Sequence, residues 1–315
     1  MLLSALLFGI GLILIIKGGD LFVGAASWIG EVARIPKFMV GATIVSLATT
    51  LPELLVSSMA ALKGSVEMAV GNAVGSVTVN TGLIMGISLF VCPIAFENLS
   101  MQMKALLMLL SGAALAAFSA SGSLEFVPCL ILLLLLGMFV VENLLSGREA
   151  DAGAMHTDRP GRGEIAKHVG MFLLGAAGIV WGAQLMVDSG TRLAEKWGIS
   201  EGIIGVTLMG VGTSLPELAT TLCALRRGEA AISVGNIIGA NTIDLTLILP
   251  ACAFLSGQAL PIGEQARRLD LPAMTLVLVA AVVPAVLKGR FRRLQGAGMI
   301  LMYLLYLGIL FSGKI

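Results

Sequence analysis

The chain has 315 residues, of which 57% are hydrophobic and only 12% are charged, and its net charge is +1. Soluble domains carry about 25% charged residues, and a soluble core could not bury this much apolar surface, so the composition excludes an ordinary soluble protein and predicts one dissolved in lipid. The small net charge gives no reason to expect nucleic acid as a partner, which leaves membrane lipid as the first expected partner.

Ten apolar segments follow one another along the chain, each near or above the roughly 20 residues that a helix needs to cross a bilayer. Spanning helices are predicted at residues 2–27, 38–62, 67–92, 103–121, 124–144, 166–194, 201–225, 231–256, 270–287 and 295–313. No basic residue precedes the first segment, as a cleaved signal peptide would require, so we expect this helix to stay in the protein. The predicted fold class is an all-α membrane protein with ten transmembrane helices.

A polar segment at residues 146–165 separates the first five helices from the last five. It contains charged residues, Gly and Pro without apolar periodicity, and it is too short to fold as a domain. The predicted organisation is therefore a five-helix repeat at residues 1–145, a linker, and a second five-helix repeat at residues 166–315.

The two halves repeat one another in sequence. After a shift of 164 residues, residues 41–83 align with residues 205–247 without a gap. The identical pairs include Gly41/Gly205, Thr43/Thr207, Thr49/Thr213, Leu51/Leu215, Pro52/Pro216, Glu53/Glu217, Gly71/Gly235, Asn72/Asn236 and Gly75/Gly239. Because each half has an odd number of helices, the second half must cross the membrane in the opposite direction. Such inverted repeats are typical of secondary transporters.

Lysine and arginine are distributed unequally between the two sides of this predicted topology. The loops after the first, third, fifth, seventh and ninth helices hold thirteen of them, and the other side holds six. Cytoplasmic loops carry the excess of basic residues. We therefore expect a multi-pass protein of the inner (plasma) membrane, with the linker in the cytoplasm and both termini outside.

Two predicted helices carry a Pro followed by a Glu near the middle of an apolar span. They read GATIVSLATTLPELLVS at residues 41–57 and GVTLMGVGTSLPELATT at residues 205–221. Hydroxyl residues three and four positions before each Glu lie on its helical face. The resulting sets are Glu53 with Thr49 and Thr50, and Glu217 with Thr213 and Ser214.

The two prolines are expected to add backbone oxygens to these sets. Proline lacks an N–H and clashes with the preceding turn, so it frees carbonyl groups. The freed carbonyls are predicted at Ala48 and Gly212 and, one turn further back, at Ser46 and Gly210. In lipid a freed carbonyl needs a partner, and a cation can supply one. Carboxylate, hydroxyl and carbonyl oxygens suit Ca²⁺ and Na⁺ rather than Zn²⁺ or copper.

The third and eighth helices are predicted to form the facing wall. They read GNAVGSVTVN and GNIIGANTID, which end at the equivalent residues Asn80 and Asp244. Ser76 lies four residues before Asn80, and its counterpart is Ala240. The two glycines in each segment form a small-xxx-small stripe that predicts close helix packing.

Three acidic residues, Glu53, Glu217 and Asp244, therefore lie in apolar spans that contain no Lys or Arg to pair with them. A charge at the bilayer centre costs on the order of 3 kcal/mol even on the lenient insertion scale. We conclude that a cation must visit this group of residues.

The remaining polar residues have simpler predicted roles. Asp20, Glu142 and Asp188 are expected to snorkel or to cap helix ends, and Asn72 and Asn236 to form interhelical hydrogen bonds. The four cysteines and two histidines show no metal-ligand spacing, so no resident cofactor is expected.

These paired motifs resemble the cation/Ca²⁺ exchanger (CaCA) superfamily, in its prokaryotic sodium/calcium exchanger branch. The resemblance rests on ATTLPE with GNAVGS in the first half and on GTSLPE with GNIIGAN in the second, and the ten-helix layout extends it over nearly the whole chain. It implies a monomeric antiporter that moves Ca²⁺ and Na⁺ in opposite directions by alternating access at a midplane site. The implied ligands are the side chains of Glu53, Asn80, Glu217 and Asp244, the hydroxyls of Thr49, Thr50, Ser76, Thr213 and Ser214, and the carbonyls of Ser46 and Gly210.

The sequence departs from the family pattern at a few positions. At Thr50, one hydroxyl residue stands in place of another. Val77 stands where the family usually has an Asn after Ser76, whereas Asn241 keeps that Asn in the second half. Ala240 lacks a hydroxyl, which puts one Na⁺ ligand in doubt. The linker has no room for the regulatory Ca²⁺-binding domains of animal relatives.

Acidic residues buried in a membrane also occur in other classes of protein. Buried carboxylates can bind protons, so Ca²⁺/H⁺ exchange is an alternative, as is K⁺-dependent Na⁺/Ca²⁺ exchange; the many hydroxyls favour Na⁺. A membrane acid pair is also used by intramembrane proteases, but no GxGD-like, Ser–His or HExxH arrangement is present, and no enzyme is expected. A channel has no need for two matched opposite halves, so a carrier is favoured.

Overall fold

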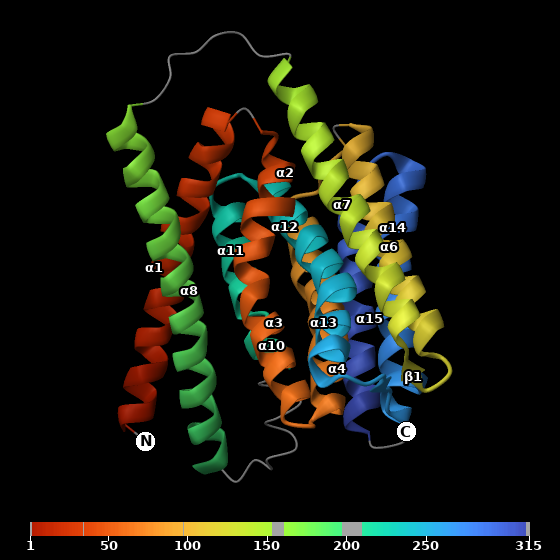
Figure 1. Ribbon diagram of the computed structural model, residues 1–315. Coiled ribbons are helices and arrows are strands. Elements are labelled where there is room, and N and C mark those ends of the chain that lie inside the picture. The colour runs from red at the N-terminus through yellow and green to blue at the C-terminus, as the bar shows by residue number, and fades with distance from the viewer. Residues whose placement is uncertain (1, 34, 97, 153–160, 197–209, 313–315) are drawn as a thin grey trace.

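The protein is described here from a computed structural model, in which almost every element is a helix (Figure 1). The described residues are 2–33, 35–96, 98–152, 161–196 and 210–312. Their α-helices are α1 (Leu2–Ala33), α2 (Lys37–Val40), α3 (Ser46–Leu62), α4 (Val66–Val79), α5 (Gly86–Val91), α6 (Leu99–Ser119), α7 (Phe126–Ala152), α8 (Arg162–Lys196), α10 (Gly210–Thr213), α11 (Leu215–Arg226), α12 (Ala230–Ile243), α13 (Leu249–Ser256), α14 (Leu271–Lys288) and α15 (Arg293–Phe311).

Short π-helical segments join several of these helices into longer rods. They are η1 (Gly41–Val45), η2 (Asn80–Met85), η4 (Asp244–Ile248) and η5 (Ala266–Asp270). One small antiparallel sheet pairs β1 (Ser123–Leu124) with β2 (Leu260–Pro261). It ties together the loops that follow α6 and α13, one from each half of the chain.

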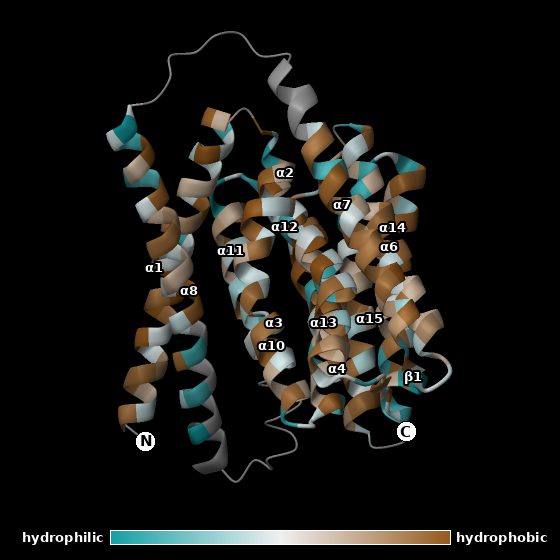
Figure 2. Ribbon diagram, viewed as in Figure 1, coloured by the Kyte–Doolittle hydropathy of each residue, from teal (hydrophilic) through white to brown (hydrophobic). Residues whose placement is uncertain are grey.

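Nine helical rods within the described residues are long and apolar enough to cross a membrane. They match nine of the ten predicted spans, and Figure 2 shows that hydrophobic residues predominate along them. The tenth prediction, residues 201–225, falls partly on residues 201–209, which lie outside the described residues. Its described part consists of α10 and α11. The protein is therefore a nearly all-helical, multi-spanning membrane protein.

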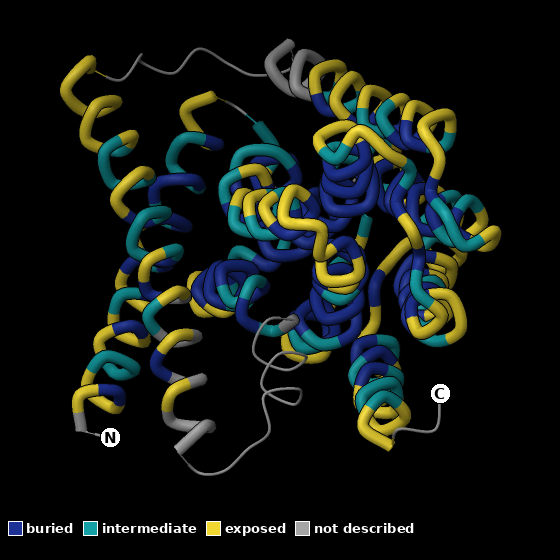
Figure 3. Tube along the Cα trace, turned by 60° about the horizontal axis from the view of Figure 1, so that its bottom comes forward, coloured by how far each residue is buried: buried dark blue, intermediate teal, exposed yellow. Residues whose placement is uncertain are grey.

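The rods differ strongly in how deeply they are buried (Figure 3). In α4–η2–α5 and α12–η4–α13, 72% and 83% of the membrane-spanning stretch is buried, against 17% in both α8 and α15. The two innermost rods carry Asn80 and Asp244, each as the first residue of a π-helical segment. Polar residues at the centre of the bundle therefore lie where lipid cannot reach them.

Helices α1 and α8 lie side by side along one edge of the bundle (Figure 1). A Cβ atom added at Gly18 would lie 2.8 Å from the carbonyl oxygen of Gly175, so only glycine permits this close approach. Phe22 of α1 and Phe172 of α8 stack with their ring centroids 4.4 Å apart. The pair contributes no residue to the predicted ligand set.

Several boundaries differ from the predictions. The first helix runs to Ala33 rather than residue 27, so Asp20 lies well inside α1 and not at its end. Helix α7 continues to Ala152 and α8 begins at Arg162, so part of the predicted linker is helical. Lys104, the second residue of the predicted span 103–121, is fully buried in α6, which begins earlier, at Leu99, and its ammonium group donates to Ser100 Oγ at 2.8 Å.

Candidate cation-binding site

The two Pro–Glu motifs reach the centre of the bundle on different backbones. Pro52 and Glu53 lie inside α3, which continues unbroken from η1. In the second half, Ser214 separates α10 from α11, and Glu217 lies in the first turn of α11 with Pro216 just before it. Pro216 lies in the first turn of its helix, where proline is tolerated, whereas Pro52 lies inside a continuous helix, where its missing N–H leaves a carbonyl of the preceding turn without a partner.

The three acidic residues predicted to bind a cation lie together and are buried. Glu53, Glu217 and Asp244 are each 1% exposed, and Asn80 is fully buried. Glu53 interacts electrostatically with both Glu217 and Asp244. The ion pairs found among the described residues, such as Lys37–Glu229, involve none of them. Their mutual repulsion and burial create a region that favours a cation.

Buried oxygens without a hydrogen-bond partner concentrate in the same place. A buried polar atom without a hydrogen-bond partner costs roughly 1–3 kcal/mol of folding free energy when nothing compensates it. Among the described residues, the unpartnered atoms are Thr50 Oγ1, both carboxyl oxygens of Glu53, both amide atoms of Asn80, Ser214 Oγ, Glu217 Oε2, Asn241 Oδ1 and Asp244 Oδ1, with Ser119 Oγ and Asn143 Oδ1 elsewhere. Six of these residues form three pairs that are equivalent in the repeat: Thr50/Ser214, Glu53/Glu217 and Asn80/Asp244.

A hydrogen-bonded frame crosses between the two halves around these atoms. Thr49 donates to Asn236 Oδ1 at 3.3 Å, and the equivalent Thr213 donates to Asn72 Oδ1 at 3.1 Å. Asn72 in turn donates to Ser57 Oγ at 2.9 Å. The predicted interhelical role of Asn72 and Asn236 is confirmed, and the threonine hydroxyls are held at the edge of the site.

The other predicted ligands differ in how the structure places them. Ser76 is fully buried, and its hydroxyl lies 3.3 Å from that of Thr213. The carbonyl of Ser46, the first residue of α3, accepts a hydrogen bond from Thr49 at 3.4 Å. Gly210 is the first residue of α10. The structure therefore brings the Ser76 and Thr213 hydroxyls together, whereas Ser46 and Gly210 lie six residues, nearly two helical turns, before the prolines.

The predicted close packing through small residues is confirmed for the second half. A Cβ atom at Gly239 would lie 2.5 Å from Ser46 Oγ, and one at Gly235 would clash with the carbonyl oxygen of Phe38. No described atom lies within 4 Å of such a Cβ at Gly71 or Gly75. Helix α12 is thus pressed against η1 and the start of α3, which brings its Asp244 end toward Glu53.

Asn241 is a residue of this site that the sequence reasoning missed as a ligand. Its amide nitrogen donates to Thr81 Oγ1 at 2.8 Å, while its Oδ1 is buried without a partner. Thr81 directly follows Asn80 in η2. The available signal was the GNIIGAN motif, in which Asn241 lies three residues before Asp244 and so on the same helical face.

The site is not a cluster of acids alone. Among the described residues, no three His, Cys, Asp or Glu side chains converge closely enough to hold a metal ion by themselves. A cation here must also use hydroxyl, amide and carbonyl oxygens. Such mixed oxygen sets suit Na⁺ and Ca²⁺, which accept neutral oxygen ligands in flexible geometries.

Fold and site together define a polytopic membrane protein with a buried, oxygen-rich candidate site for a cation. Residues 3–145 and 167–312 match the sodium/calcium exchanger protein family, and the chain belongs to this family. It is a prokaryotic-type member of the cation/Ca²⁺ exchanger superfamily.

Curated relatives and solved structures align with most of the chain. Inner membrane protein YrbG of Escherichia coli is 35% identical over 263 residues, which cover 81% of each chain. Sodium/calcium exchanger MaX1 of Methanosarcina acetivorans is 28% identical and covers 96% of this chain and 97% of its own. A structure of the sodium-calcium exchanger NCX_Mj soaked with Na⁺ and Sr²⁺ superimposes with a TM-score of 0.86 at 27% identity over 98% of both chains.

Proposed function

We propose that this protein is a secondary antiporter that exchanges Ca²⁺ for Na⁺ across the membrane, by alternating access at the central site. The observation that carries the proposal is the set of buried, unpartnered oxygens that the two halves contribute in equivalent pairs. Lipid hydrocarbon cannot satisfy those oxygens, whereas a bound cation can. Family membership supports the choice of Na⁺ and Ca²⁺, which are cargo rather than resident cofactors.

The proposed ligands surround the carboxylates of Glu53 and Glu217. Side chains are supplied by Glu53, Asn80, Glu217, Asp244, Thr49, Thr50, Ser76, Thr213 and Ser214, and carbonyls by Ser46 and Gly210. Ca²⁺ takes six to eight oxygens, and this set offers enough of them without a third converging acid. The same oxygens hold Na⁺ in the opposite half of the cycle.

The full topology is part of the proposal. Residues 1–145 and 166–315 form two inverted five-helix repeats joined by the linker at residues 146–165. The linker faces the cytoplasm, both termini lie outside, and a monomer in the plasma membrane performs the exchange. Cysteines placed in residues 150–160 would be protected from an impermeant thiol reagent in intact cells, and labelling from outside would contradict this topology.

Transport into proteoliposomes tests the function. Vesicles that contain the purified protein are loaded with Na⁺ and diluted into Na⁺-free medium with ⁴⁵Ca²⁺, and we expect uptake that collapses when Na⁺ is equal on both sides. An acid-inside pH gradient should not replace Na⁺. Uptake driven by that pH gradient alone would identify Ca²⁺/H⁺ exchange instead, and a requirement for K⁺ would identify K⁺-dependent exchange.

A further inference from the structure

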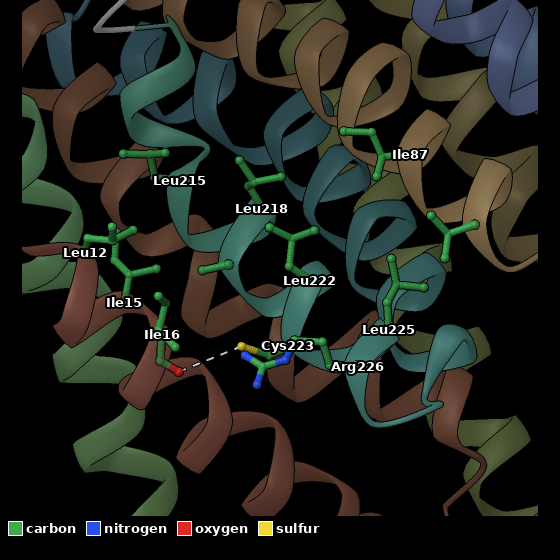
Figure 4. A pocket seen from close by; sticks show the side chains of 12 residues that line it. Leu12, Ile15, Ile16, Ile87, Leu215, Leu218, Leu222, Cys223, Leu225 and Arg226 are labelled. Carbon is green, nitrogen blue, oxygen red and sulfur yellow. Dashed lines mark hydrogen bonds between the residues drawn. The ribbon is translucent and has the colours of Figure 1, made fainter.

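A crevice of about 670 Å³ lies outside the cation site, between α1, α5 and α11 (Figure 4). Eleven of its twelve lining residues are apolar, and the other is Arg226. Its floor is closed by buried side chains such as Ile15 and Ala219, whereas Leu12 and Leu222 at its rim are each 43% exposed. In a membrane, such a rim faces the lipid.

This crevice is not a route for ions. An ion passing along it would meet no polar partner on the walls except the like-charged guanidinium group of Arg226, and transfer into apolar surroundings costs several kcal/mol. An apolar hollow left empty forfeits the dispersion contacts of its walls. The material at hand to fill it is hydrocarbon, because α1 and the rod that ends in α5 both span the membrane.

One end of the crevice reaches the membrane surface. Val91 is the last residue of its spanning rod, and Arg226 is the last residue of α11, directly after the predicted span 201–225. Figure 4 shows Arg226 beside Cys223 at one end of the crevice, away from Leu215. The leucine and isoleucine walls suit hydrocarbon, and the charged end, where two spans finish, suits a lipid headgroup.

The charges at that end favour an anion. Arg226 is exposed and belongs to none of the ion pairs seen among the described residues. Arg227 beside it donates to the backbone carbonyl of Asp20 at 2.8 Å, which anchors α11 to α1. The carboxyl of Asp20 opposes these two guanidinium groups and leaves one positive charge in excess. Arginine recognises phosphate by paired, charge-assisted hydrogen bonds.

We propose that this crevice is a binding site for an acidic phospholipid, with one acyl chain between α1 and α11 and the headgroup phosphate on Arg226. The chain lies against Leu215 and Leu218, which flank Pro216 and Glu217 in the first turn of α11. The lipid therefore packs on the outer face of the turn whose inner face carries a residue of the cation site.

Photolabelling tests the site directly. The purified protein is placed in nanodiscs with phosphatidylglycerol that carries a diazirine on its acyl chain, and labelled peptides are identified by mass spectrometry. We expect enrichment at residues 12–16 and 218–222. Leu222→Trp, which fills the crevice from its rim, should lower that labelling roughly tenfold, the factor that corresponds to about 1.4 kcal/mol of binding free energy. Leu134→Trp, at a 69% exposed position on α7, is the matched control and should leave it unchanged.

Arg226→Gln tests the headgroup and sits at an exposed position, so it leaves folding intact. We expect it to lower labelling by the phosphatidylglycerol probe several-fold, and to lower labelling by a phosphatidylcholine probe with the same acyl chain by a smaller factor, because the choline cation of that lipid offsets the charge of its phosphate. Labelling spread evenly over α7 and α15, or unaffected by Leu222→Trp, would overturn the site. Labelling by the phosphatidylglycerol probe that Arg226→Gln leaves unchanged would overturn the assignment of the phosphate, and equal loss of both probes would overturn the preference for an acidic lipid. Neither readout depends on ion exchange, so failure here is separate from failure of the proposed function.

Discussion

The two Pro–Glu segments present the same side chains on different backbones. Glu53 lies in the middle of the continuous α3, whereas Glu217 lies in the first turn of α11, just after the break at Ser214. A helix N-terminus favours a negative charge by its exposed N–H groups, and the middle of a helix offers none. Two equivalent carboxylates are therefore positioned at one site by two different backbone arrangements, a continuous helix and a helix N-terminus.

The facing walls differ more in chemistry than in backbone. Asn80 and Asp244 each begin a π-helical segment, yet only Asp244 adds a charge. Asn241 donates to Thr81 across the two halves, and its counterpart Val77 cannot form such a bond. The two halves therefore differ in side-chain chemistry along the rods α4–η2 and α12–η4, and not at the glutamates.

The largest effect is expected when either glutamate loses its charge. Glu53→Gln and Glu217→Gln should each lower Na⁺-driven ⁴⁵Ca²⁺ uptake by at least about 100-fold, which corresponds to a loss of about 2.7 kcal/mol of cation binding. The two losses should be similar although the backbones differ. Glu264→Gln, which removes an exposed carboxylate paired with Arg268, is the control and should retain uptake. Near wild-type uptake by either buried variant would contradict the site.

The next effect concerns charge and sharpens the comparison of Asn80 with Asp244. Three carboxylates are neutralised by three Na⁺ but not by one Ca²⁺, so wild-type exchange should respond to membrane potential. Asp244→Asn makes the two walls alike, and either one Ca²⁺ or two Na⁺ then neutralises the site. We expect this variant to lose the voltage response, measured in liposomes clamped with valinomycin and K⁺. A wild-type flux indifferent to potential would show equally charged loaded states and favour two Na⁺ per Ca²⁺.

Removal of the bond between the two halves should have a smaller effect. Asn241→Val gives the second half the residue found at Val77 and releases Thr81 beside Asn80. We expect the apparent KM for Ca²⁺ to rise about fivefold to tenfold, the equivalent of one buried hydrogen bond. Asn143→Val, which removes a buried asparagine bonded to Phe139 of its own helix, should leave the KM unchanged. An unchanged KM in Asn241→Val would show that this bond does not position Asn80.

The smallest effect is expected from restoring the missing hydroxyl. Ala240→Ser gives the second half the side chain found at Ser76, and we expect the Na⁺ concentration for half-maximal exchange to fall about threefold. Ala231→Ser adds a hydroxyl near the start of the same helix and serves as the control. If Ala240→Ser matched that control, position 240 would not face bound Na⁺.

Much of this site could be predicted because acids, amides and prolines stand out in apolar spans. Glu53, Glu217 and Asp244 were found from the lack of basic partners, and the structure brings them together. The break at Ser214 could not be predicted, because the first half has the same Leu–Pro–Glu motif without a break. Such breaks and the π-helical segments are set by tertiary packing, to which local propensity is a weak guide.

The surroundings of single charged residues could not be predicted from the sequence either. Lys104 lies at the start of the predicted span 103–121, where a charged side chain is expected to reach solvent, yet it packs over the ring of Phe38 and donates to Ser100. Asp20 read as a helix end because the apolar run weakens there, and α1 continues to Ala33. Both outcomes depend on neighbours from other helices, which one-dimensional periodicity does not contain.

Equilibrium binding of ⁴⁵Ca²⁺ to the purified protein tests the central claim most directly, because it needs neither a gradient nor a complete transport cycle. The site described here predicts Ca²⁺ binding that Na⁺ displaces competitively, and loss of that binding in both Glu53→Gln and Glu217→Gln, with Glu264→Gln unaffected. Ca²⁺ binding that survives in both glutamine variants, or that Na⁺ fails to displace, would contradict a shared Na⁺ and Ca²⁺ site at the centre of the bundle.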